Sequence, residues 1–343
     1  MPKKTRPSLL RSACNGLFFV FCALLFYLSS LSVSPAAQIS RVKLLVGYSS
    51  PSGSQAVLWV AKESGAFSRH GIDVELIFVG SGSKMTQAVL AGELKIAQLG
   101  GVAPIAARLG GADAKIIAVS FNTLANSLIV NREIQSVHDL KGKRVGVSRF
   151  GTNTDAGARY VIKKNGLVPD RDVAILQLGD IPAVFAALQT GAVQGGILSY
   201  PTTARALKMG FKELVDISEI GLEYPGTNIV TMDRFLRSQP DLVRGFLMAF
   251  IEGIHRYKSD AAFTKRVIGQ YARITDAGIL DDTYRLFAQK LQKIPYPTPG
   301  GIRFALETLI DNPKARQARP EEFYDDTILR ALEREGLVEQ LYR

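Results

Sequence analysis

Three consecutive polar residues, Thr152, Asn153 and Thr154, stand where a short strand gives way to a helix, and residues of these types can hold an anion. Each is a good helix N-cap, because its side-chain oxygen can accept a backbone N–H of the first turn. Asp155 follows Thr152 at three residues, a spacing at which an acidic residue supports both the cap and the helix dipole. Free N–H groups with hydroxyls beside them favour an anionic or strongly polar small ligand.

The elements around this loop read as strand, loop and helix. Residues 144–148 alternate in apolar character, which predicts a strand, and apolar residues at helical spacing then run to Gly166, which predicts a helix and its end. A capped helix start occurs in any such unit, so the loop alone does not identify a site.

The same pattern recurs in the preceding part of the chain. Strands are predicted at 41–49, 73–79, 96–99 and 115–120, with helices between them, and each strand ends in Ser, Gly, Asn or Thr. Strands alternating with helices predict a mostly parallel sheet with helices on both faces. Ligands of such sheets bind at the carboxyl ends of the strands.

A second α/β unit follows from about residue 139 to residue 218, and one more strand is expected at 228–232. The remaining chain predicts five helices, at 240–257, 261–271, 281–293, 302–311 and 321–336. These helices cannot form a sheet domain alone, so we expect them to pack on the first unit. The result is an α/β protein of two lobes, crossed near residues 124–132 and 219–228, with a cleft between the lobes.

The first 37 residues have the pattern of a secretory signal peptide. A basic start is followed by a continuous apolar run from Leu17 to Leu28, and small residues then offer a cleavage site after Ala36 or Ala37. An uncleaved membrane anchor is the alternative, although the run is shorter than the roughly 20 residues of a bilayer span. We therefore expect export to the periplasm.

Cysteine and charge exclude several classes of function. Both cysteines, Cys14 and Cys22, lie in the predicted signal, so the mature chain has no disulfide, no cysteine nucleophile and no cysteine metal site. Loss of the signal lowers the formal charge from +11 to +7, and the remaining Lys and Arg are scattered. We expect no nucleic-acid partner.

No pattern for catalysis stands out. His70, His138 and His255 are far apart in the sequence, and no metalloprotease, hydrolase or phosphate-binding loop motif occurs. Arg149 is a cation in a predicted cleft loop, where it either clamps an acidic group or faces solvent. We predict no catalytic residue, no metal and no cofactor.

The segments that carry a family resemblance run through nearly all of the mature chain, from about Val42 onward. They include YSSPSGSQAVLWVAKESGAFSRHGIDVELIFVGSGSKMTQAVLAGELKIAQLGG, DLKGKRVGVSRFGTNTDAGARYVIKKNGL and PDLVRGFLMAFIEGI. Together they resemble the periplasmic substrate-binding proteins of the nitrate, sulfonate and taurine family of ABC importers, whose fold the thiamine-pyrimidine binding proteins share. The resemblance implies a two-lobed, type II periplasmic binding protein that closes on a small-molecule ligand. It implies delivery to an ABC transporter permease with its cytoplasmic ATPase, and a monomer.

The resemblance also implies lobe boundaries and ligand contacts. Residues 38–128 and 223–343 would form lobe 1, with the C-terminal helices, and residues 129–222 would form lobe 2. The implied contacts in lobe 1 are Ser49, Ser50, Ser52, Gly53, Gln55, Ser81, Gly82, Gly101, Val102, Asn122 and Thr123. Those in lobe 2 and at the return crossover are Gly151, Thr152, Asn153, Thr154, Tyr200, Tyr224 and Asn228.

Alternative functions remain at this point. The ligand could be a thiamine-pyrimidine or another heterocyclic precursor, or the protein could be a ligand-sensing module of a membrane receptor. An enzyme is a further alternative, since a pyrimidine synthase has this fold, but its cysteine-rich loop has no counterpart in a mature chain without cysteine.

Overall fold

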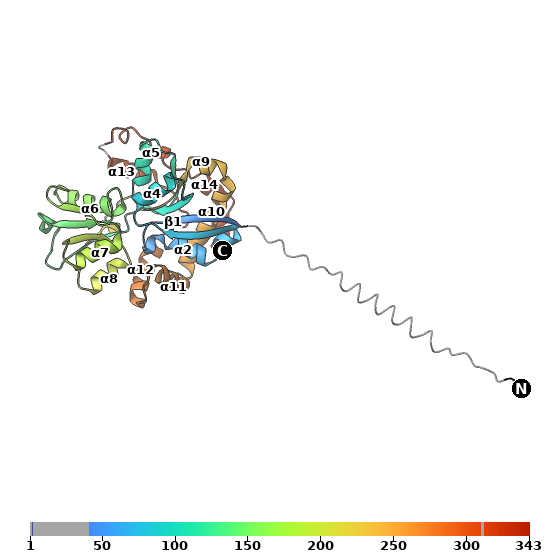
Figure 1. Ribbon diagram of the computed structural model, residues 1–343, viewed down its shortest axis with the longest axis horizontal. Helices are drawn as coiled ribbons and strands as arrows, with labels where there is room; N and C mark the ends of the chain where they lie inside the picture. Colours follow the sequence, from blue (N-terminus) through green and yellow to red (C-terminus); the bar gives the residue numbers. More distant parts are fainter. Residues whose placement is uncertain (1, 3–40, 310–311) are drawn as a thin grey trace. The chain divides into compact units, whose positions relative to one another are not determined.

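Two five-stranded sheets organise the part of the chain that a computed structural model describes, which comprises residues 2, 41–309 and 312–343 (Figure 1). The predicted signal peptide lies outside the described residues apart from Pro2 and stays a prediction. The first sheet has the order β2 (Ile72–Phe78), β1 (Val42–Tyr48), β3 (Ile96–Leu99), β10 (Thr227–Met232) and β4 (Ala114–Phe121). The second has the order β7 (Ala174–Gln177), β6 (Arg144–Val147), β8 (Gly195–Leu198), β5 (Ser127–Val130) and β9 (Lys212–Asp216).

Both sheets are mixed, whereas the sequence pattern predicts mostly parallel pairing. In the first sheet, β1 is parallel to β2 and β3, but β10 runs antiparallel to β3 and β4. In the second sheet, β5 runs antiparallel to β8 and β9. Each antiparallel strand is the one by which the chain enters or re-enters that sheet. The exact division of the chain at residues 128 and 222 stays a prediction.

Most helices lie beside the sheet whose strands they connect (Figure 1). The helices after the first-sheet strands are η1 (Gly53–Gln55), α2 (Ala56–Glu63), α3 (Ala66–Arg69), α4 (Gly82–Leu90) and α5 (Ala103–Leu109). Those of the second sheet are η2 (Val137–Leu140), α6 (Asn153–Lys164), α7 (Ile181–Gln189), α8 (Thr202–Lys208) and η3 (Ile217–Glu219). Those after β10 are α9 (Asp233–Ser238), α10 (Pro240–Ser259), α11 (Ala261–Ala272), α12 (Ala277–Lys290), α13 (Pro299–Glu307), η4 (Pro320–Glu322), α14 (Thr327–Arg334) and α15 (Leu337–Leu341).

The C-terminal helices pack on the first lobe, as expected for helices that have no sheet of their own. Phe246 and Phe250 of α10 join a buried cluster with Val46 of β1 and Val57 of α2. Trp59 of α2 is fully buried in the same cluster, and its ring stacks on Tyr271 at 4.9 Å. This core fixes the loop that follows β1.

The prediction of one helix over residues 321–336 is wrong. The Ile116 N–H donates to the Phe323 carbonyl at 3.0 Å, and the Asp325 N–H donates to the Ile116 carbonyl at 2.8 Å. The segment is therefore pinned to the edge of β4, and a helix can begin only at Thr327. Gly336, with φ of +81°, then separates α14 from α15.

Candidate functional site

A cavity of about 50 Å³ lies where loops of the two sheets meet. Its residues lie in the loops that follow strands β1, β2, β3, β6 and β8, at the start of α7, and at the N-terminal ends of β5 and β10. The lining is Ser49, Ser50, Ser52, Ser54, Gln55, Ser81, Gly82, Gly100, Ala125, Asn126, Ser148, Thr152, Asn153, Thr154, Asp180, Ile181, Ser199, Gly226 and Thr227. Hydroxyl groups dominate this set, and the carboxyl ends of strands are where α/β sheets bind ligands.

Gln55 stabilises the part of the cavity wall that comes from the first lobe. Its Oε1 accepts the backbone N–H of Ser49 at 2.9 Å, and its Nε2 donates to Ser49 Oγ at 2.9 Å. Both residues are buried. Because one side chain satisfies both groups of Ser49, the loop after β1 is fixed before any ligand arrives.

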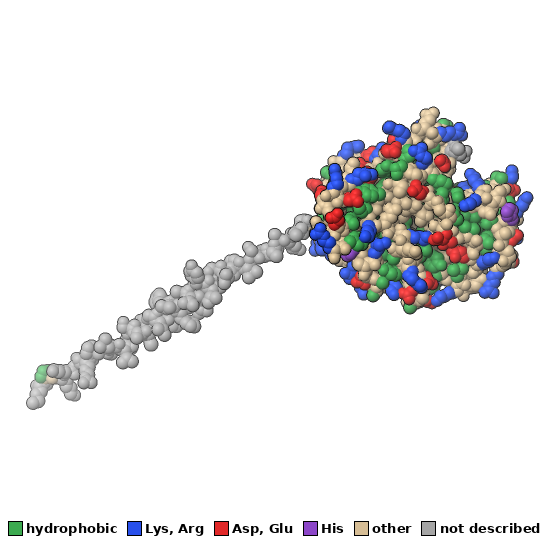
Figure 2. Space-filling view, turned by 180° about the vertical axis from the view of Figure 1, so that it is seen from behind, with side chains coloured by type: hydrophobic (Ala, Val, Ile, Leu, Met, Phe, Trp, Pro, Cys, Tyr) green, Lys and Arg blue, Asp and Glu red, His purple; other side chains and the backbone are tan. Residues whose placement is uncertain are grey.

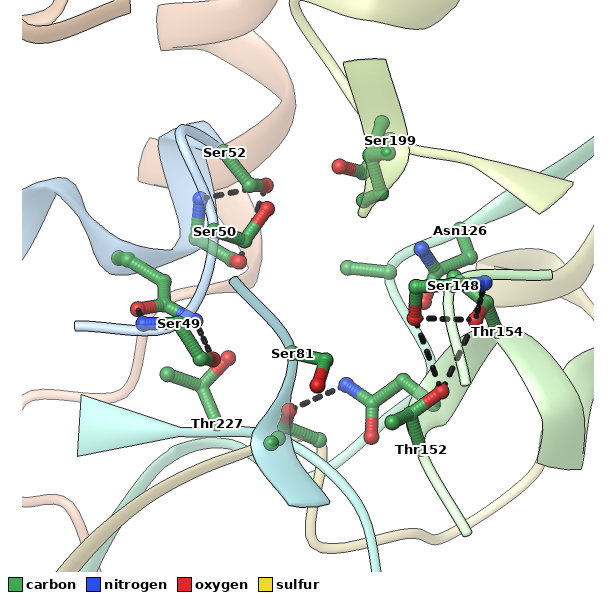
Figure 3. Close-up of a pocket in the computed structure, with 18 of the residues that line it drawn as sticks. Ser49, Ser50, Ser52, Ser81, Asn126, Ser148, Thr152, Thr154, Ser199 and Thr227 are labelled. Atoms are coloured by element: carbon green, nitrogen blue, oxygen red, sulfur yellow. Dashed lines mark hydrogen bonds between the residues drawn. The ribbon is translucent and has the colours of Figure 1, made fainter. Parts of the chain in front are cut away.

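Three hydroxyls form a closed triangle on the wall that the second lobe contributes (Figure 3). Ser148 Oγ lies 2.8 Å from Thr154 Oγ1 and 3.1 Å from Thr152 Oγ1, and the two threonine oxygens are 2.9 Å apart. Figure 3 shows this group opposite Ser49, Ser50 and Ser81. The triangle sets the start of α6 against the end of β6.

Several buried polar atoms at the cavity have no hydrogen-bond partner within the described residues. They are Ser50 Oγ, Ser81 Oγ and Asn153 Oδ1. Buried polar atoms are rarely left unpaired, since each costs about 1–3 kcal/mol, and exceptions call for an explanation such as a bound water, ion or ligand. Ser81 also has a φ of +82°, a backbone conformation that a residue other than glycine seldom adopts without functional need. These atoms are free to accept or donate a hydrogen bond at the cavity.

Hydrogen bonds join the two lobes around the cavity. Asn153 Nδ2 donates to the Gly226 carbonyl at 2.6 Å, and Ser83 Oγ donates to the Phe150 carbonyl at 2.9 Å. On another side, the Tyr200 carbonyl accepts the Gly53 N–H at 3.0 Å. The lobes are therefore closed on each other in this structure.

Gly100 permits this close approach. A Cβ at residue 100 would lie 2.2 Å from Asn153 Nδ2 and 2.6 Å from the Gly226 carbonyl oxygen. Any larger residue would separate the end of β3 from the start of α6, so the contact between the lobes depends on glycine here.

Asp180 is the one ionisable residue in the cavity lining. Its Oδ1 accepts the Ala183 N–H at 2.9 Å, which caps α7. The lining therefore offers hydroxyls, amides and N–H groups, with Asp180 as its single carboxylate.

Asp155 lies outside the lining and stabilises a loop beside the cavity. Its Oδ2 accepts the Gly151 N–H at 2.9 Å, and its Oδ1 accepts Arg159 Nε at 2.7 Å. Burial raises the pKa of Asp155, against the lowering effect of the Gly151 N–H and of Arg159. This residue is the charge in the first helical turn that the sequence predicts, and it positions the loop that precedes Thr152.

The cavity brings together part of the residue set that the sequence predicts. Lining residues from that set are Ser49, Ser50, Ser52, Gln55, Ser81, Gly82, Thr152, Asn153 and Thr154. The structure places the others outside the lining: Gly53, Gly101, Val102, Asn122, Thr123, Gly151, Tyr200, Tyr224 and Asn228. Whether any residue of either group contacts a ligand stays a prediction.

Structural roles account for several residues outside the lining. Asn122 Nδ2 donates to the Tyr296 carbonyl at 2.9 Å, and Asn228 Nδ2 donates to the Gly101 carbonyl at 3.3 Å. Tyr224 is fully buried, and burial raises its pKa strongly. Arg149, the predicted cleft cation, also lies outside the lining, although its Nε is buried without a hydrogen-bond partner among the described residues.

Residues that sequence reasoning missed complete the lining. These are Ser54, Gly100, Ala125, Asn126, Ser148, Asp180, Ile181, Ser199, Gly226 and Thr227. The sequence does indicate a helix start at Asp180, since an acidic residue followed by Ile-Pro is typical of the beginning of a helix. Ser148 belongs to the predicted strand at 144–148, but β6 ends at Val147, so Ser148 is the first loop residue. Ser199 likewise follows the last residue of β8 directly.

The histidines lie away from the cavity. His70 Nε2 pairs with Glu252 Oε1 at 2.6 Å, and the His255 ring packs edge-on against Tyr342 at 4.7 Å. Among the described residues, no group of three or more His, Cys, Asp or Glu side chains is arranged to hold a metal ion.

The comparisons with known proteins agree with this architecture. Residues 53–260 match the NMT1/THI5-like family, a span of more than half of the chain. The chain belongs to the NMT1/THI5-like family. It is 28% identical over 174 residues to a putative binding protein of Brucella abortus (strain 2308), covering 50% of this chain and 53% of that protein. It is 25% identical over 253 residues to the nitrate/nitrite binding protein NrtA of Nostoc sp., covering 65% of this chain and 56% of that protein.

These alignments span about half the length of the relatives that this NMT1/THI5-like chain matches. Its structure is similar to the alkanesulfonate-binding protein SsuA from Xanthomonas axonopodis pv. citri bound to MOPS, with a TM-score of 0.71 and 18% identity. That match covers 83% of this chain and 98% of SsuA. At this identity the likeness establishes the fold, which is the two-lobed fold of periplasmic binding proteins.

The surface and the helices give two further facts about this family member. On the face seen in Figure 2, basic and acidic side chains are interspersed over both lobes. In residues 41–309 and 312–343, no helix combines the length and apolar character needed to cross a membrane.

Proposed function

We propose that the protein is an extracytoplasmic solute-binding protein. It would capture a small polar or anionic ligand, such as a sulfonate, nitrate or taurine, between its lobes and deliver it to an ABC importer permease. The observation that supports this proposal most directly is that Ser50 Oγ, Ser81 Oγ and Asn153 Oδ1 are buried around one cavity without hydrogen-bond partners among the described residues. A ligand that pairs with these atoms would remove their desolvation cost and so favour the closed form.

The chemistry of the lining supports an oxyanion or another strongly hydrogen-bonding head group. Hydroxyls from both lobes converge on the cavity, and Thr152 begins the N-terminal turn of α6, whose backbone N–H groups attract negative charge. The volume of about 50 Å³ suits a group of a few non-hydrogen atoms, since a water molecule needs about 10–15 Å³ by the same measure.

Relatives support the same class of function. NrtA is named as a nitrate/nitrite binding protein, and the solved SsuA is named as an alkanesulfonate-binding protein. We extend binding, rather than catalysis, to this chain on that basis. A periplasmic location, a permease partner and a monomeric state belong to the same proposal.

A thermal-shift screen of residues 38–343 tests the proposal. The panel contains nitrate, bicarbonate, taurine, alkanesulfonates and aromatic carboxylates, with thiamine and flavin precursors as the heterocyclic arm. A ligand present at about 100 times its dissociation constant adds about 2.7 kcal/mol to the free energy of unfolding, which raises the melting temperature measurably. A hit among the oxyanions supports the proposal, and a hit only among the heterocycles contradicts its ligand class.

The matched variants separate binding at the cavity from binding elsewhere. The double substitution Thr152→Ala and Asn153→Ala removes a hydroxyl and the amide from the lining and should abolish the ligand-induced shift. Ser68→Ala with Thr190→Ala, outside the lining, should keep the shift. An unchanged shift in the first pair would refute the site.

A further inference from the structure

Helix α8 of the second lobe packs against helix α12 of the first lobe, at a place outside the lining of the cavity (Figure 1). Ala204 of α8, Ile274 ahead of α12 and Ile279 in the first turn of α12 form a separate apolar cluster. They are 6%, 8% and 4% exposed. This cluster therefore takes its members from both lobes.

The two faces of α8 belong to different apolar clusters. Ala206 is buried with Val184 of α7 in a cluster of the second lobe, and Leu207 packs against that cluster. Ala204 is buried instead with the isoleucines of the first lobe. Separation of the lobes would leave the cluster at Ala206 intact and would divide the cluster at Ala204. Burial of the second cluster is thus a property of the closed form, and it favours that form.

Ion pairs join α12 to the second lobe at both of its ends. At the N-terminal end, Lys208 Nζ of α8 donates to Asp276 Oδ2 at 2.5 Å. Asp276 Oδ1 accepts the Ile279 N–H at 3.0 Å and so caps α12. At the C-terminal end, Lys290 pairs with Glu219 of η3. The attraction across the lobes is lost if they separate.

Tyr200 connects the contact between α8 and α12 with the cavity. Its side chain packs on the apolar cluster of Ala204. Its carbonyl accepts the Gly53 N–H at 3.0 Å and the Ser52 hydroxyl at 3.3 Å. Ser52 and Ser199, the residue before Tyr200, both line the cavity. The helix contact and the cavity therefore form together when the lobes close.

We infer that this contact is a latch, which holds part of the ligand-free protein in the closed form and so sets the affinity for every ligand of the cavity. The latch residues are Ala204, Lys208, Ile274, Asp276 and Ile279, which all lie outside the cavity lining. The apparent affinity of a ligand for the closed form falls with the fraction of protein that is closed. Contacts made only on closure raise that fraction, whatever the ligand. The latch residues act as positioning residues.

Distances between spin labels in the ligand-free protein test the latch. Val42→Cys and Val168→Cys, both exposed and on different lobes, carry the labels in the chain from residue 38 onward, which has no other cysteine. The parent should show a short and a long component. Lys208→Met should lower the ratio of short to long component roughly two- to fivefold, as expected for an exposed ion pair. Ala204→Trp, which inserts bulk between α8 and α12, should lower it at least about fivefold.

Matched variants separate the latch from general effects on the fold. Lys265→Met breaks another ion pair of α12, with Asp281 at 2.6 Å, but both of these residues belong to the first lobe. Ala262→Trp adds bulk at an exposed position of α11. Both should keep the parent ratio. Asp276→Asn keeps the helix cap, and its combination with Lys208→Met should lower the ratio no further than either change alone. The melting temperature of each variant reports whether it folds.

Binding of nitrate and of methanesulfonate measures the consequence for affinity. In calorimetric titration, Lys208→Met should weaken the binding of both probes by the same factor, because the latch contacts neither of them. Lys265→Met should change neither affinity by more than about twofold. A loss confined to one probe would overturn the inference, since it would indicate a direct effect on the cavity.

The outcomes distinguish the latch from the proposed function. A ligand-free parent with the long component alone would overturn the latch. A ratio that stays unchanged in both Lys208→Met and Ala204→Trp would also overturn it. Failure of nitrate and methanesulfonate to bind would count against the proposed function alone, since a short component that both variants reduce supports the latch without any ligand.

Discussion

The side-chain amide of Asn153 donates a 2.6 Å hydrogen bond to the carbonyl of Gly226, and this contact ties helix α6 of the second lobe to the chain entering β10 of the first. The same side chain leaves its Oδ1 buried at the cavity without a partner among the described residues. One residue thus contributes both to closure of the lobes and to the proposed contact with ligand, and the proposal therefore couples binding to closure at Asn153.

Asn153→Asp should weaken ligand binding by about tenfold to hundredfold. The change keeps the shape but replaces the donor by an oxygen that faces the Gly226 carbonyl, and an unsatisfied buried group costs about 1–3 kcal/mol. Calorimetric titration with the best ligand of the screen measures the effect. Asn165→Asp, at the other end of α6, is the matched control and should change affinity less than about twofold. Similar losses in both variants would contradict the assigned role.

Gln55→Leu should lower the free energy of unfolding by about 1–3 kcal/mol. The substitution leaves the buried N–H of Ser49 without its acceptor, and that desolvation cost is no longer compensated. Urea denaturation of the ligand-free protein measures the loss. Gln87→Leu on the exposed side of α4 should stay within about 0.5 kcal/mol of the parent. A loss below about 0.5 kcal/mol for Gln55→Leu would show that the two hydrogen bonds between Gln55 and Ser49 contribute little to the free energy of unfolding.

Asp180→Asn should tighten the binding of an anionic ligand by roughly tenfold. Asparagine caps a helix about as well as aspartate, so α7 keeps its start, while the negative charge at the cavity is removed. A like charge about 6–12 Å away costs roughly 1.4–3 kcal/mol at an effective dielectric constant near 20. Asp260→Asn, which caps α11 outside the cavity, is the control for titration. Weaker binding in Asp180→Asn would indicate that the carboxylate itself contacts a donor on the ligand.

Asp155 gives the stability a defined pH dependence. Burial raises its pKa above the ordinary value of 3.8, so the folded protein holds this proton to a higher pH than the unfolded chain does. Its contribution to stability is therefore largest at low pH and is lost as the pH rises through the raised pKa. The stability of the parent minus that of Asp155→Asn should be larger at pH 4 than at pH 7 in urea denaturation. A difference that grows with pH would contradict the assignment.

The sequence predicts the strands closely because their apolar alternation and flanking turns are local features. The range 96–99 is reproduced in β3, and the strand predicted at 73–79 is one residue displaced from β2. Pairing direction is not local: β10 inserts between β3 and β4, and nothing in residues 227–232 themselves encodes that neighbour choice. The same holds for the segment at Phe323, whose binding to Ile116 replaces a predicted helical turn.

The candidate site was predictable where a polar loop follows a strand directly. The residues after β1 and before α6 fall in this class, and most of those named from the sequence line the cavity. In β10, the residue that lines the cavity is decided by the alternation of side chains between the two faces of the strand. Thr227 lines the cavity, while the neighbouring Asn228 is fully buried and donates a hydrogen bond to the Gly101 carbonyl. A shift of one residue exchanges the two faces, and the sequence does not fix that register.

A distance measurement between the lobes tests the central claim most directly. The chain after residue 37 contains no cysteine, so Val42→Cys and Val168→Cys, both exposed and on different lobes, accept paired spin labels cleanly. Saturation with the ligand found by thermal shift should shorten the inter-label distance and narrow its distribution. The same addition to the Thr152→Ala and Asn153→Ala double variant should have no effect. A ligand that raises the melting temperature but leaves the inter-label distance distribution unchanged in the parent would contradict ligand-induced closure at this cavity.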